Sequence, residues 1–440
     1  MKKSKFNKYY AEKLAKFSQN RLFQSLDPPL QDFIRETGEK YRLTFQELQQ
    51  VTEIAVDLNM WEEPSIIKQW NHFELLLSNN NGRKKENILI NLKKHWLSLK
   101  AKESVYNING PNVKSVVRKV KENTGKNDVF GLCPVASEKT VCCNLYTIDA
   151  VQGCGLGCSY CSIQTFYEDG AIGIEKNLSE KLNQILLDPD KNYHIGSGQS
   201  SDSLAMGNRN GILEAQLEFA EKHPNIILEF KTKTKNVDYF LSHNIPKNIF
   251  VCWSVNPQII INNEEHFTAS LAQRISAARQ LANAGIIVGF HFHPIVCYEG
   301  WDAEYRNIVQ TLLRTFSPNE IGMISMGTLT FIKPAIKNLR ALGIKSKILQ
   351  IQFKDASGKY SYSREIKEKI FGTVWEAFKP WHDKVFFYLC MEERELWKSV
   401  MGRSYDSNNE FEDALFSSVS GKMESLKRNN LLKTAPIRPV

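Results

Sequence analysis

The stretch "GCGLGCSYCSI", residues 153–163, places Cys154, Cys158 and Cys161 in a C-x3-C-x2-C spacing. Cysteine thiolates bind metals, and the three interleaved glycines let the backbone wrap closely around a compact metal group. A structural zinc site normally has four protein ligands, and an electron-transferring iron–sulfur cluster normally has four cysteines. Three thiolates would leave one iron of a [4Fe–4S] cluster free to bind a small molecule. A zinc site and three unrelated buried thiols are the alternatives.

The pattern around these cysteines predicts alternating strands and helices. We expect six strands, at 146–151, 193–198, 226–231, 249–255, 286–292 and 321–327. Each is followed by a helix, or by a loop and a helix, which predicts right-handed βα units and a parallel sheet. A closed eight-unit barrel needs more repeats, so the fold class is α/β with a partial (β/α)6 TIM-like barrel. The cysteines follow the first strand, at the carboxyl edge where such folds bind ligands.

The rest of the chain divides by its pattern into further segments. The first hundred residues read as amphipathic helices, one of them with a capping box at Thr44 and Glu47. A last strand is expected at 384–390, with a helical tail after it. The predicted domains are a basic helical domain at 1–105, a linker with Cys133, Cys142 and Cys143 at 106–144, the barrel at 145–390 and a helical extension at 391–440.

Charge is unevenly distributed along the 440 residues. The net charge is +9, and residues 1–126 hold 23 Lys and Arg against 14 Asp and Glu, whereas the remainder holds 34 of each. A basic domain beside a neutral body favours nucleic acid as a partner, and a solvated helical surface is the alternative. We expect a cytoplasmic protein, because no 18-residue apolar run or secretion signal is seen and nine cysteines suit a reducing compartment.

The cysteine spacing on the first strand of a βα barrel, with Tyr160 just before the third cysteine, resembles the radical S-adenosylmethionine (SAM) superfamily. In that superfamily the open iron of a [4Fe–4S] cluster binds SAM, whose reductive cleavage gives a 5′-deoxyadenosyl radical. The resemblance therefore implies a [4Fe–4S] cluster and SAM as cofactors. It also implies an electron donor such as a flavodoxin or a ferredoxin.

Five downstream stretches are similar to the spore photoproduct lyase family, which splits a thymine–thymine crosslink in DNA. They are "GSGQSSDSL", "EFKTKTKNVDYFL", "FVCWSVNP", "NAGIIVGFHFHPIVCYEGWDAEYRNI" and "FIKPAIKNLR", and the similarity runs from about 145 to 390. The resemblance implies a carbon–carbon lyase that repairs a DNA base lesion, with the basic N-terminal domain on the nucleic acid. A radical SAM enzyme for an RNA base, a peptide or a metabolite is the alternative, and a non-catalytic iron–sulfur sensor is a further one.

The family's functional positions carry over onto particular residues of this chain. The cluster ligands are Cys154, Cys158 and Cys161. The positions at which the family contacts SAM are Tyr160, Ser200, Ser201, Lys233 and Ser254. Tyr160 also stands at one of the family's two radical-relay tyrosines. Hydroxyl groups and an ammonium group suit the ribose and carboxylate of SAM.

Two positions depart from the family. The cysteine that returns a hydrogen atom in the family is Gln199 here, and the second relay tyrosine is Ser162. Another thiol must then be the donor, or the substrate must differ. Our first choice is Cys390, because it ends the last predicted strand and points to the same barrel mouth. Cys133, Cys142 and Cys143 could alternatively hold a second metal. His291 and His293 lie on one face of the fifth strand, where we expect them to line the substrate cavity, and a metal-binding pair is the alternative.

Overall fold

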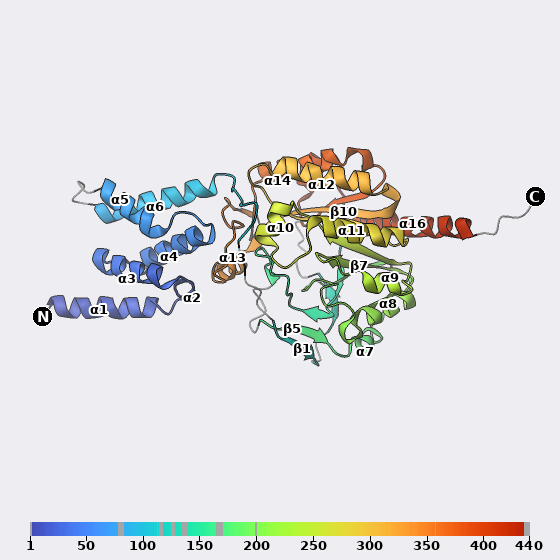
Figure 1. The fold of residues 1–440 in the computed structure, drawn as a ribbon, viewed down its shortest axis with the longest axis horizontal. Helices are drawn as coiled ribbons and strands as arrows, with labels where there is room; N and C mark the ends of the chain where they lie inside the picture. Colours follow the sequence, from blue (N-terminus) through green and yellow to red (C-terminus); the bar gives the residue numbers. More distant parts are fainter. Residues whose placement is uncertain are drawn as a thin grey trace, which may run out of the picture. The chain divides into compact units, whose positions relative to one another are not determined.

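The computed structural model of the chain describes residues 2–77, 83–111, 113, 118–124, 128–133, 140–163, 170–198, 200–356 and 358–434. It forms two compact units (Figure 1). Unit 1 combines residues 1–111 with residues 330–363, and unit 2 combines residues 112–329 with residues 364–440. No helix of the described residues is long and apolar enough to cross a membrane.

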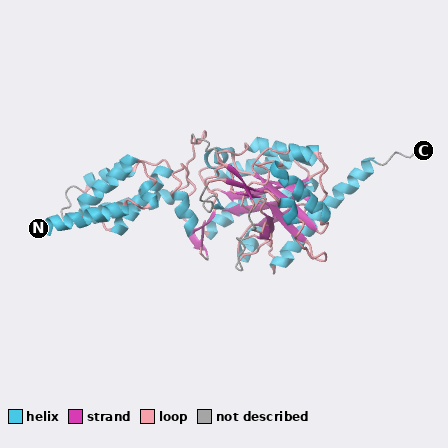
Figure 2. Ribbon diagram, turned by 90° about the horizontal axis from the view of Figure 1, so that it is seen from below, coloured by secondary structure: helices cyan, strands magenta, loops and turns pink. Residues whose placement is uncertain are grey.

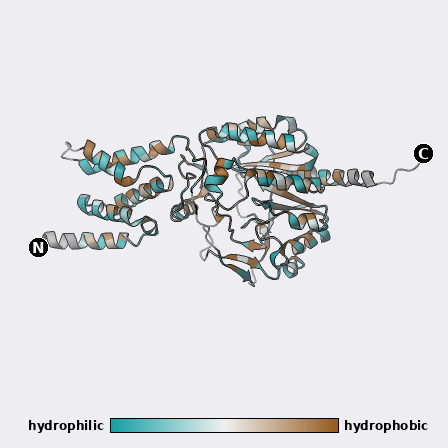
Figure 3. Cartoon of the chain, viewed as in Figure 1, coloured by the Kyte–Doolittle hydropathy of each residue, from teal (hydrophilic) through white to brown (hydrophobic). Residues whose placement is uncertain are grey.

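The N-terminal part of unit 1 is helical. Its helices are α1 (Lys2–Phe17), α2 (Arg21–Gln24), α3 (Pro28–Tyr41), α4 (Phe45–Met60), α5 (Ile66–Leu76) and α6 (Lys84–Lys100). The capping box expected at the start of α4 is present, with the Thr44 side chain accepting from the Glu47 backbone N–H. Brown hydrophobic and teal hydrophilic residues share these helices, as amphipathic helices require (Figure 3).

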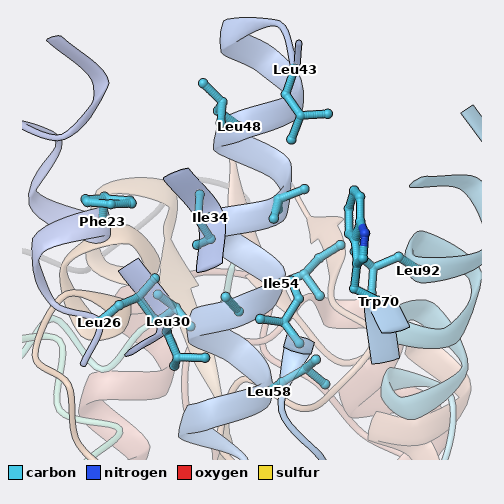
Figure 4. Close-up of a cluster of buried hydrophobic side chains, with 14 of the residues drawn as sticks. Phe23, Leu26, Leu30, Ile34, Leu43, Leu48, Ile54, Leu58, Trp70 and Leu92 are labelled. Atoms are coloured by element: carbon cyan, nitrogen blue, oxygen red, sulfur yellow. The ribbon is translucent and has the colours of Figure 1, made fainter. Parts of the chain in front are cut away.

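The apolar faces of these helices form one buried core. Figure 4 shows Ile34 of α3, Ile54 and Leu58 of α4, Trp70 of α5 and Leu92 of α6 within it. Each of these side chains is at most 2% exposed. Burial of this kind contributes roughly 25 cal/mol per Å² of apolar surface, which makes the core the main stabilising feature of the N-terminal part.

The second part of unit 1 is a small insertion from the barrel sequence. It contains β11 (Thr330–Ile332), α13 (Lys333–Arg340), β12 (Lys354–Ala356) and β13 (Lys359–Ser361), with antiparallel strand order β11-β13-β12. The sequence pattern assigns 330–363 to the barrel segment at 145–390, whereas the structure packs it against the N-terminal helices. The Arg340 guanidinium donates to both carboxylate oxygens of buried Asp57, at 2.8 and 2.9 Å, and Lys345 Nζ donates to the side chain of Asn59 at 2.7 Å.

Unit 2 is built on a curled eight-stranded sheet, drawn in magenta in Figure 2. Its order is β14 (Phe386–Leu389), β10 (Ile321–Thr328), β9 (Ile287–Ile295), β8 (Ile249–Ser254), β7 (Ile226–Thr232), β6 (Tyr193–Ser197), β3 (Tyr146–Ile148) and β2 (Phe130–Leu132). All neighbours are parallel except β2, which runs antiparallel to β3. The predicted α/β class and partial barrel are confirmed, and each predicted strand begins and ends within about three residues of an observed one.

Helices follow the strands of this sheet. They are α7 (Leu178–Leu182), α8 (Ile212–Lys222), α9 (Asp238–Ser242), α10 (Gln258–Glu264), α11 (Leu271–Asn283), α12 (Trp301–Thr315), α14 (Arg364–Ala377), α15 (Arg394–Met401) and α16 (Asn408–Thr434). The last two form the expected helical tail. Short 3-10 turns lie at Arg209–Gly211, Pro318–Glu320 and Lys379–Trp381. A second sheet of order β1-β5-β4 combines β1 (Val120–Asn123), β5 (Ile172–Glu175) and β4 (Val151–Gln152).

Candidate metal centre

The three cysteines of the C-x3-C-x2-C motif lie in a loop directly after β4, the short strand of the second sheet that follows barrel strand β3. Two of the interleaved glycines are required by the path of this loop. Gly153 has φ +81° and Gly157 has φ +65°, which other residues rarely adopt. A Cβ atom at Gly157 would also lie 2.9 Å from the Phe267 ring. The loop therefore curls tightly, and the Cys154 and Cys161 thiols lie close enough to Cys158 to raise its pKa.

The thiols of this loop lie in a buried environment. Cys158 is buried, and Cys154 and Cys161 are half-buried. Burial raises the pKa of the Cys154 thiol to about 11 and that of Cys158 well above its ordinary value. The backbone N–H groups of Leu156 and Asp202 donate to the Cys154 sulfur. Such thiols lose their protons when a strong Lewis acid binds, and oriented N–H donors then stabilise the thiolate. The donor set fits an iron cluster held by three cysteines.

The cysteine loop is fixed to the segment that follows α10. The Ser159 backbone N–H donates to the Glu264 carbonyl at 2.8 Å, and the Phe267 N–H donates to the Leu156 carbonyl at 3.1 Å. Between these bonds, Cys158 and Glu265 pair in an isolated antiparallel bridge. The middle of the loop, from Leu156 to Ser159, is thus held against one neighbouring segment.

Glu265 is the centre of a buried polar network beside the thiols. Its carboxylate accepts hydrogen bonds from the Tyr160 hydroxyl, from Asn256 Nδ2 at 2.8 Å and from the Arg274 guanidinium. Lys233 Nζ lies 3.8 Å from the same carboxylate. Burial alone would raise the pKa of Glu265, but Arg274 and Lys233 more than offset it and lower the pKa to about 2. The group is therefore a fixed anion that orients Tyr160 and Lys233.

The polar loop after β6 approaches the same region. Asp202 is buried and accepts from the Lys233 backbone N–H at 2.6 Å, from the Thr232 hydroxyl at 2.9 Å and from the Leu204 N–H at 3.0 Å. Ser200 Oγ lies 3.1 Å from Asp149 Oδ1 and 3.0 Å from the Val151 carbonyl. Asp202 thus joins the loop after β6 to the end of β7, and Ser200 joins it to the junction of β3 and β4.

The residues predicted to contact SAM are partly brought together by these bonds. Lys233 Nζ lies 5.8 Å from the centre of the Tyr160 ring, and Ser254 is tied to the network through its carbonyl, which accepts from Arg274 at 2.9 Å. Ser201 donates to the Asp202 carbonyl at 3.4 Å. Gln199 lies outside the described residues, and Ser162 is half-buried next to the third cysteine. The roles of these residues remain predictions.

Three members of this network were not foreseen from the sequence, namely Glu265, Arg274 and Asn256. Glu265 lies in "NNEEHF", which reads as a solvated acidic turn, and Arg274 lies on an ordinary amphipathic helix. The structure instead leaves Glu265 at 1% and Arg274 at 0% exposure. The burial of this ion pair results from the packing of α11 against β8, which the sequence pattern does not predict.

A second polar cluster lies across the inner face of the sheet. Glu229 of β7 accepts from His194 Nε2 of β6 at 3.0 Å and contacts His291 Nε2 of β9 at 2.5 Å, and Lys231 Nζ lies 3.4 Å from it. Within the described residues, the one group of three metal-type donors within 4.8 Å of one another is Glu229, Cys252 and His291. Because Glu229 is already paired with two imidazoles and an ammonium group, it serves as an anionic anchor for the inner face.

Four of the remaining cysteines gather near this cluster. The thiols of Cys133, Cys143 and Cys390 lie close enough to the Lys231 ammonium to act on its pKa, and Cys142 hydrogen-bonds to Cys143. Val141 and Glu392 form an antiparallel bridge, which brings the segment of Cys143 beside that of Cys390. Burial raises the pKa of Cys390 to about 12, so that it is a thiol at neutral pH. None of the described interactions joins Cys390 directly to Tyr160 or to the three clustered cysteines.

The family model for spore photoproduct lyase matches residues 87–372 of the chain. This chain belongs to the spore photoproduct lyase family. The family resemblance predicted from the motifs is therefore confirmed. Curated members include the spore photoproduct lyases of Clostridium acetobutylicum, 28% identical over 171 residues, and of Geobacillus sp., 26% identical over 226 residues. These matches cover 38% and 50% of this chain, and 51% and 65% of the respective relatives, so the chain spans about half to two thirds of their length.

Solved structures of the family share the fold. A spore photoproduct lyase complexed with dinucleoside spore photoproduct superposes with a TM-score of 0.53 and 23% identity, covering 61% of this chain and 82% of that one. A double mutant of a spore photoproduct lyase with bound AdoMet and dinucleoside spore photoproduct gives a TM-score of 0.52 at 23% identity, covering 61% of this chain and 81% of that one. The partial-barrel architecture of unit 2 is thus that of the family.

Proposed function

We propose that this protein is a radical SAM enzyme that repairs a base lesion in DNA, as a carbon–carbon lyase of the spore photoproduct type. The observation that carries the proposal is the three-cysteine loop, whose thiols lie close enough to act on one another's pKa and whose backbone is held beside the network of Glu265. That arrangement occurs in a chain of the spore photoproduct lyase family.

Cys154, Cys158 and Cys161 would hold a [4Fe–4S] cluster and leave one iron open for SAM. When bound, the cluster and SAM would together supply a 5′-deoxyadenosyl radical, which abstracts a hydrogen atom from the substrate. The chain's own residues bind and orient the cofactor. The hydroxyls of Ser200, Ser201 and Ser254 suit its ribose, while the Lys233 ammonium suits its carboxylate. Tyr160 keeps its proton near the site, because burial raises the pKa of its hydroxyl well above the ordinary value.

DNA is the substrate that the comparisons favour. The curated relatives are spore photoproduct lyases, and a related structure holds dinucleoside spore photoproduct. A lesion in a duplex must be turned out into the barrel mouth, at a cost of about a few kcal/mol that is smallest for damaged bases. Unit 1 suits the DNA backbone, because it holds 25 Lys and Arg against 14 Asp and Glu, whereas unit 2 holds 32 against 34.

Cys390 is our proposed hydrogen-atom donor. Its S–H bond would break homolytically, the hydrogen atom would form a C–H bond with the product radical, and the unpaired electron would remain on sulfur. The position supports this role, since the thiol is protonated and lies at the carboxyl end of β14, near Lys231 on the inner face. The amide at Gln199 cannot donate a hydrogen atom in this way.

Replacing Cys390 by alanine is expected to stop the incorporation of solvent hydrogen into the repaired product. Thiol protons exchange with water, so turnover in D₂O should place deuterium in the product of the unaltered protein. The Cys390→Ala variant should give no deuterated product while still forming 5′-deoxyadenosine. Mass spectrometry of the product measures both, and Cys297→Ala is the matched control. Normal deuterated product from Cys390→Ala would remove Cys390 from the mechanism.

A one-electron donor such as a flavodoxin or ferredoxin would reduce the cluster in the cell. We place the protein in the cytoplasm, because all nine cysteines are free thiols and a reducing compartment keeps them so.

The proposed function is tested by anaerobic reconstitution with iron and sulfide, followed by SAM and a chemical reductant. We expect 5′-deoxyadenosine to form, and its yield to rise when DNA with a thymine–thymine photoproduct is added. Failure to cleave SAM would overturn the enzymatic proposal. Cleavage that is indifferent to DNA, RNA and their lesions would point to a peptide or metabolite substrate.

A further inference from the structure

Unit 1 contains a pocket that the proposed chemistry does not use. Its volume is about 1050 Å³, and residues of α4, α6, α13 and the segment up to β13 line it. All of these residues belong to unit 1. The insertion at 330–363 therefore completes the pocket, which the N-terminal helices would not form alone.

The charged side chains that line the pocket are mainly positive. Four cationic side chains, Lys100, Lys333, Lys337 and Arg340, face a single carboxylate, Glu53. Arg340 is neutralised by Asp57, with which it forms a two-bond ion pair. Lys333 and Lys337 are exposed and form no ion pair with any described residue. The pocket thus presents two uncompensated positive charges to an incoming ligand.

The position of these two lysines is unfavourable for the helix that bears them. They are four residues apart on α13, where like charges repel, and Lys333 lies at the helix N-terminus, where a cation opposes the helix dipole. The whole insertion repeats this bias, with seven Lys and Arg against one Asp. Residues that destabilise the helix or strand in which they lie occur mainly at functional sites. The bias therefore indicates an anionic partner.

The lining also provides surfaces for a flat ring. Phe353 and Tyr360 are half-buried in the pocket wall, and the aliphatic side chains of Leu22, Leu97 and Leu349 lie beside them. Aromatic side chains stack on nucleobases regardless of sequence, while lysines contact the phosphates between them. A volume of about 1050 Å³ is at the upper end of pockets for small ligands, which leaves room for more than one nucleotide.

We propose that this pocket binds an unpaired stretch of a DNA strand, with phosphates at Lys333 and Lys337 and a base against Tyr360. The inference rests on the proposed function, because it takes DNA as the partner. It deepens that function by making the insertion at 330–363, rather than the N-terminal helices alone, the element that holds the strand.

The test uses the full-length protein, a fluorescein-labelled 12-nucleotide oligothymidylate and fluorescence anisotropy over a range of salt concentrations. The Lys333→Ala/Lys337→Ala variant is expected to bind about tenfold more weakly, and its log–log salt slope should fall by about 1.4 in magnitude, because two phosphate contacts are lost. Tyr360→Ala should weaken binding about fivefold or more with an unchanged salt slope. The matched control is Lys93→Ala/Lys94→Ala, which removes two exposed lysines of α6 outside the pocket.

Equal weakening by the control and pocket variants would overturn the proposal, because it would indicate only diffuse attraction to a basic surface. Preference for an unlabelled duplex competitor over the single strand, or no binding by the unaltered protein, would overturn it too. SAM cleavage is measured without DNA in every variant and should equal that of the unaltered protein. Unchanged DNA binding by the pocket variants, with SAM cleavage intact, refutes this inference alone, whereas absent SAM cleavage by the unaltered protein refutes the proposed function.

Discussion

Replacing Cys158 by alanine is expected to abolish binding of the iron–sulfur cluster and all 5′-deoxyadenosine formation. Cys158 is the buried member of the three cysteines, and it pairs with Glu265 in a β-bridge. Two thiolates from a loop of eight residues cannot hold four irons. Iron and sulfide content, visible absorbance and electron paramagnetic resonance of the reconstituted protein measure the loss.

The control for this substitution is Cys297→Ala, which removes a half-buried thiol outside the motif and should leave the iron content unchanged. Circular dichroism of the apo form should be the same for both variants. Full iron content in Cys158→Ala would show that the three cysteines are not the ligand set.

Replacing Glu265 by alanine is expected to lower the free energy of unfolding of the apo protein by about 3–5 kcal/mol, which is the usual cost of leaving one partner of a buried ion pair alone. Arg274 would then be a buried cation without its carboxylate, since it is 0% exposed. The hydroxyl of Tyr160 and the side chain of Asn256 would lose their acceptor as well. Urea-induced unfolding followed by fluorescence measures the change.

A second pair in the same unit provides the matched control. Arg279 and Glu320 also form an ion pair, but their side chains are 26% and 20% exposed. Glu320→Ala is therefore expected to cost no more than about 1 kcal/mol. Equal costs for the two substitutions would mean that Glu265 is not the buried anchor of the site. Glu265→Ala should also weaken SAM binding in the reconstituted protein, because Lys233 and Tyr160 lose their common partner.

The parts that the sequence predicts well are those with a local signal. The strands of the barrel are apolar runs that end at glycine, polar or helix-starting residues. The spacing of the cysteine motif is typical of only a few kinds of metal site. The capping box of α4 is likewise a pattern within four residues. These features depend on residues that are neighbours along the chain, so they can be predicted without knowing how the chain packs.

The parts that the sequence does not reveal depend on contacts between distant segments. Nothing in "FIKPAIKNLR" shows that α13 packs on α4, since its apolar face would fit the barrel equally well. Asp57 reads as a solvent-facing residue of a helix until Arg340, far along the chain, is placed against it. Glu265 and Arg274 are missed for the same reason, because burial of an ion pair is a property of the packed structure.

The discontinuity of unit 1 has a consequence for how the protein is made. Residues 1–111 are synthesised before their partner segment at 330–363, which follows more than two hundred residues later. Until then Asp57 lacks the guanidinium that neutralises it, and the wall that α13 supplies is missing. An N-terminal fragment that ends before residue 330 is therefore an incomplete domain. The basic unit acquires its final form only after most of unit 2 has been synthesised.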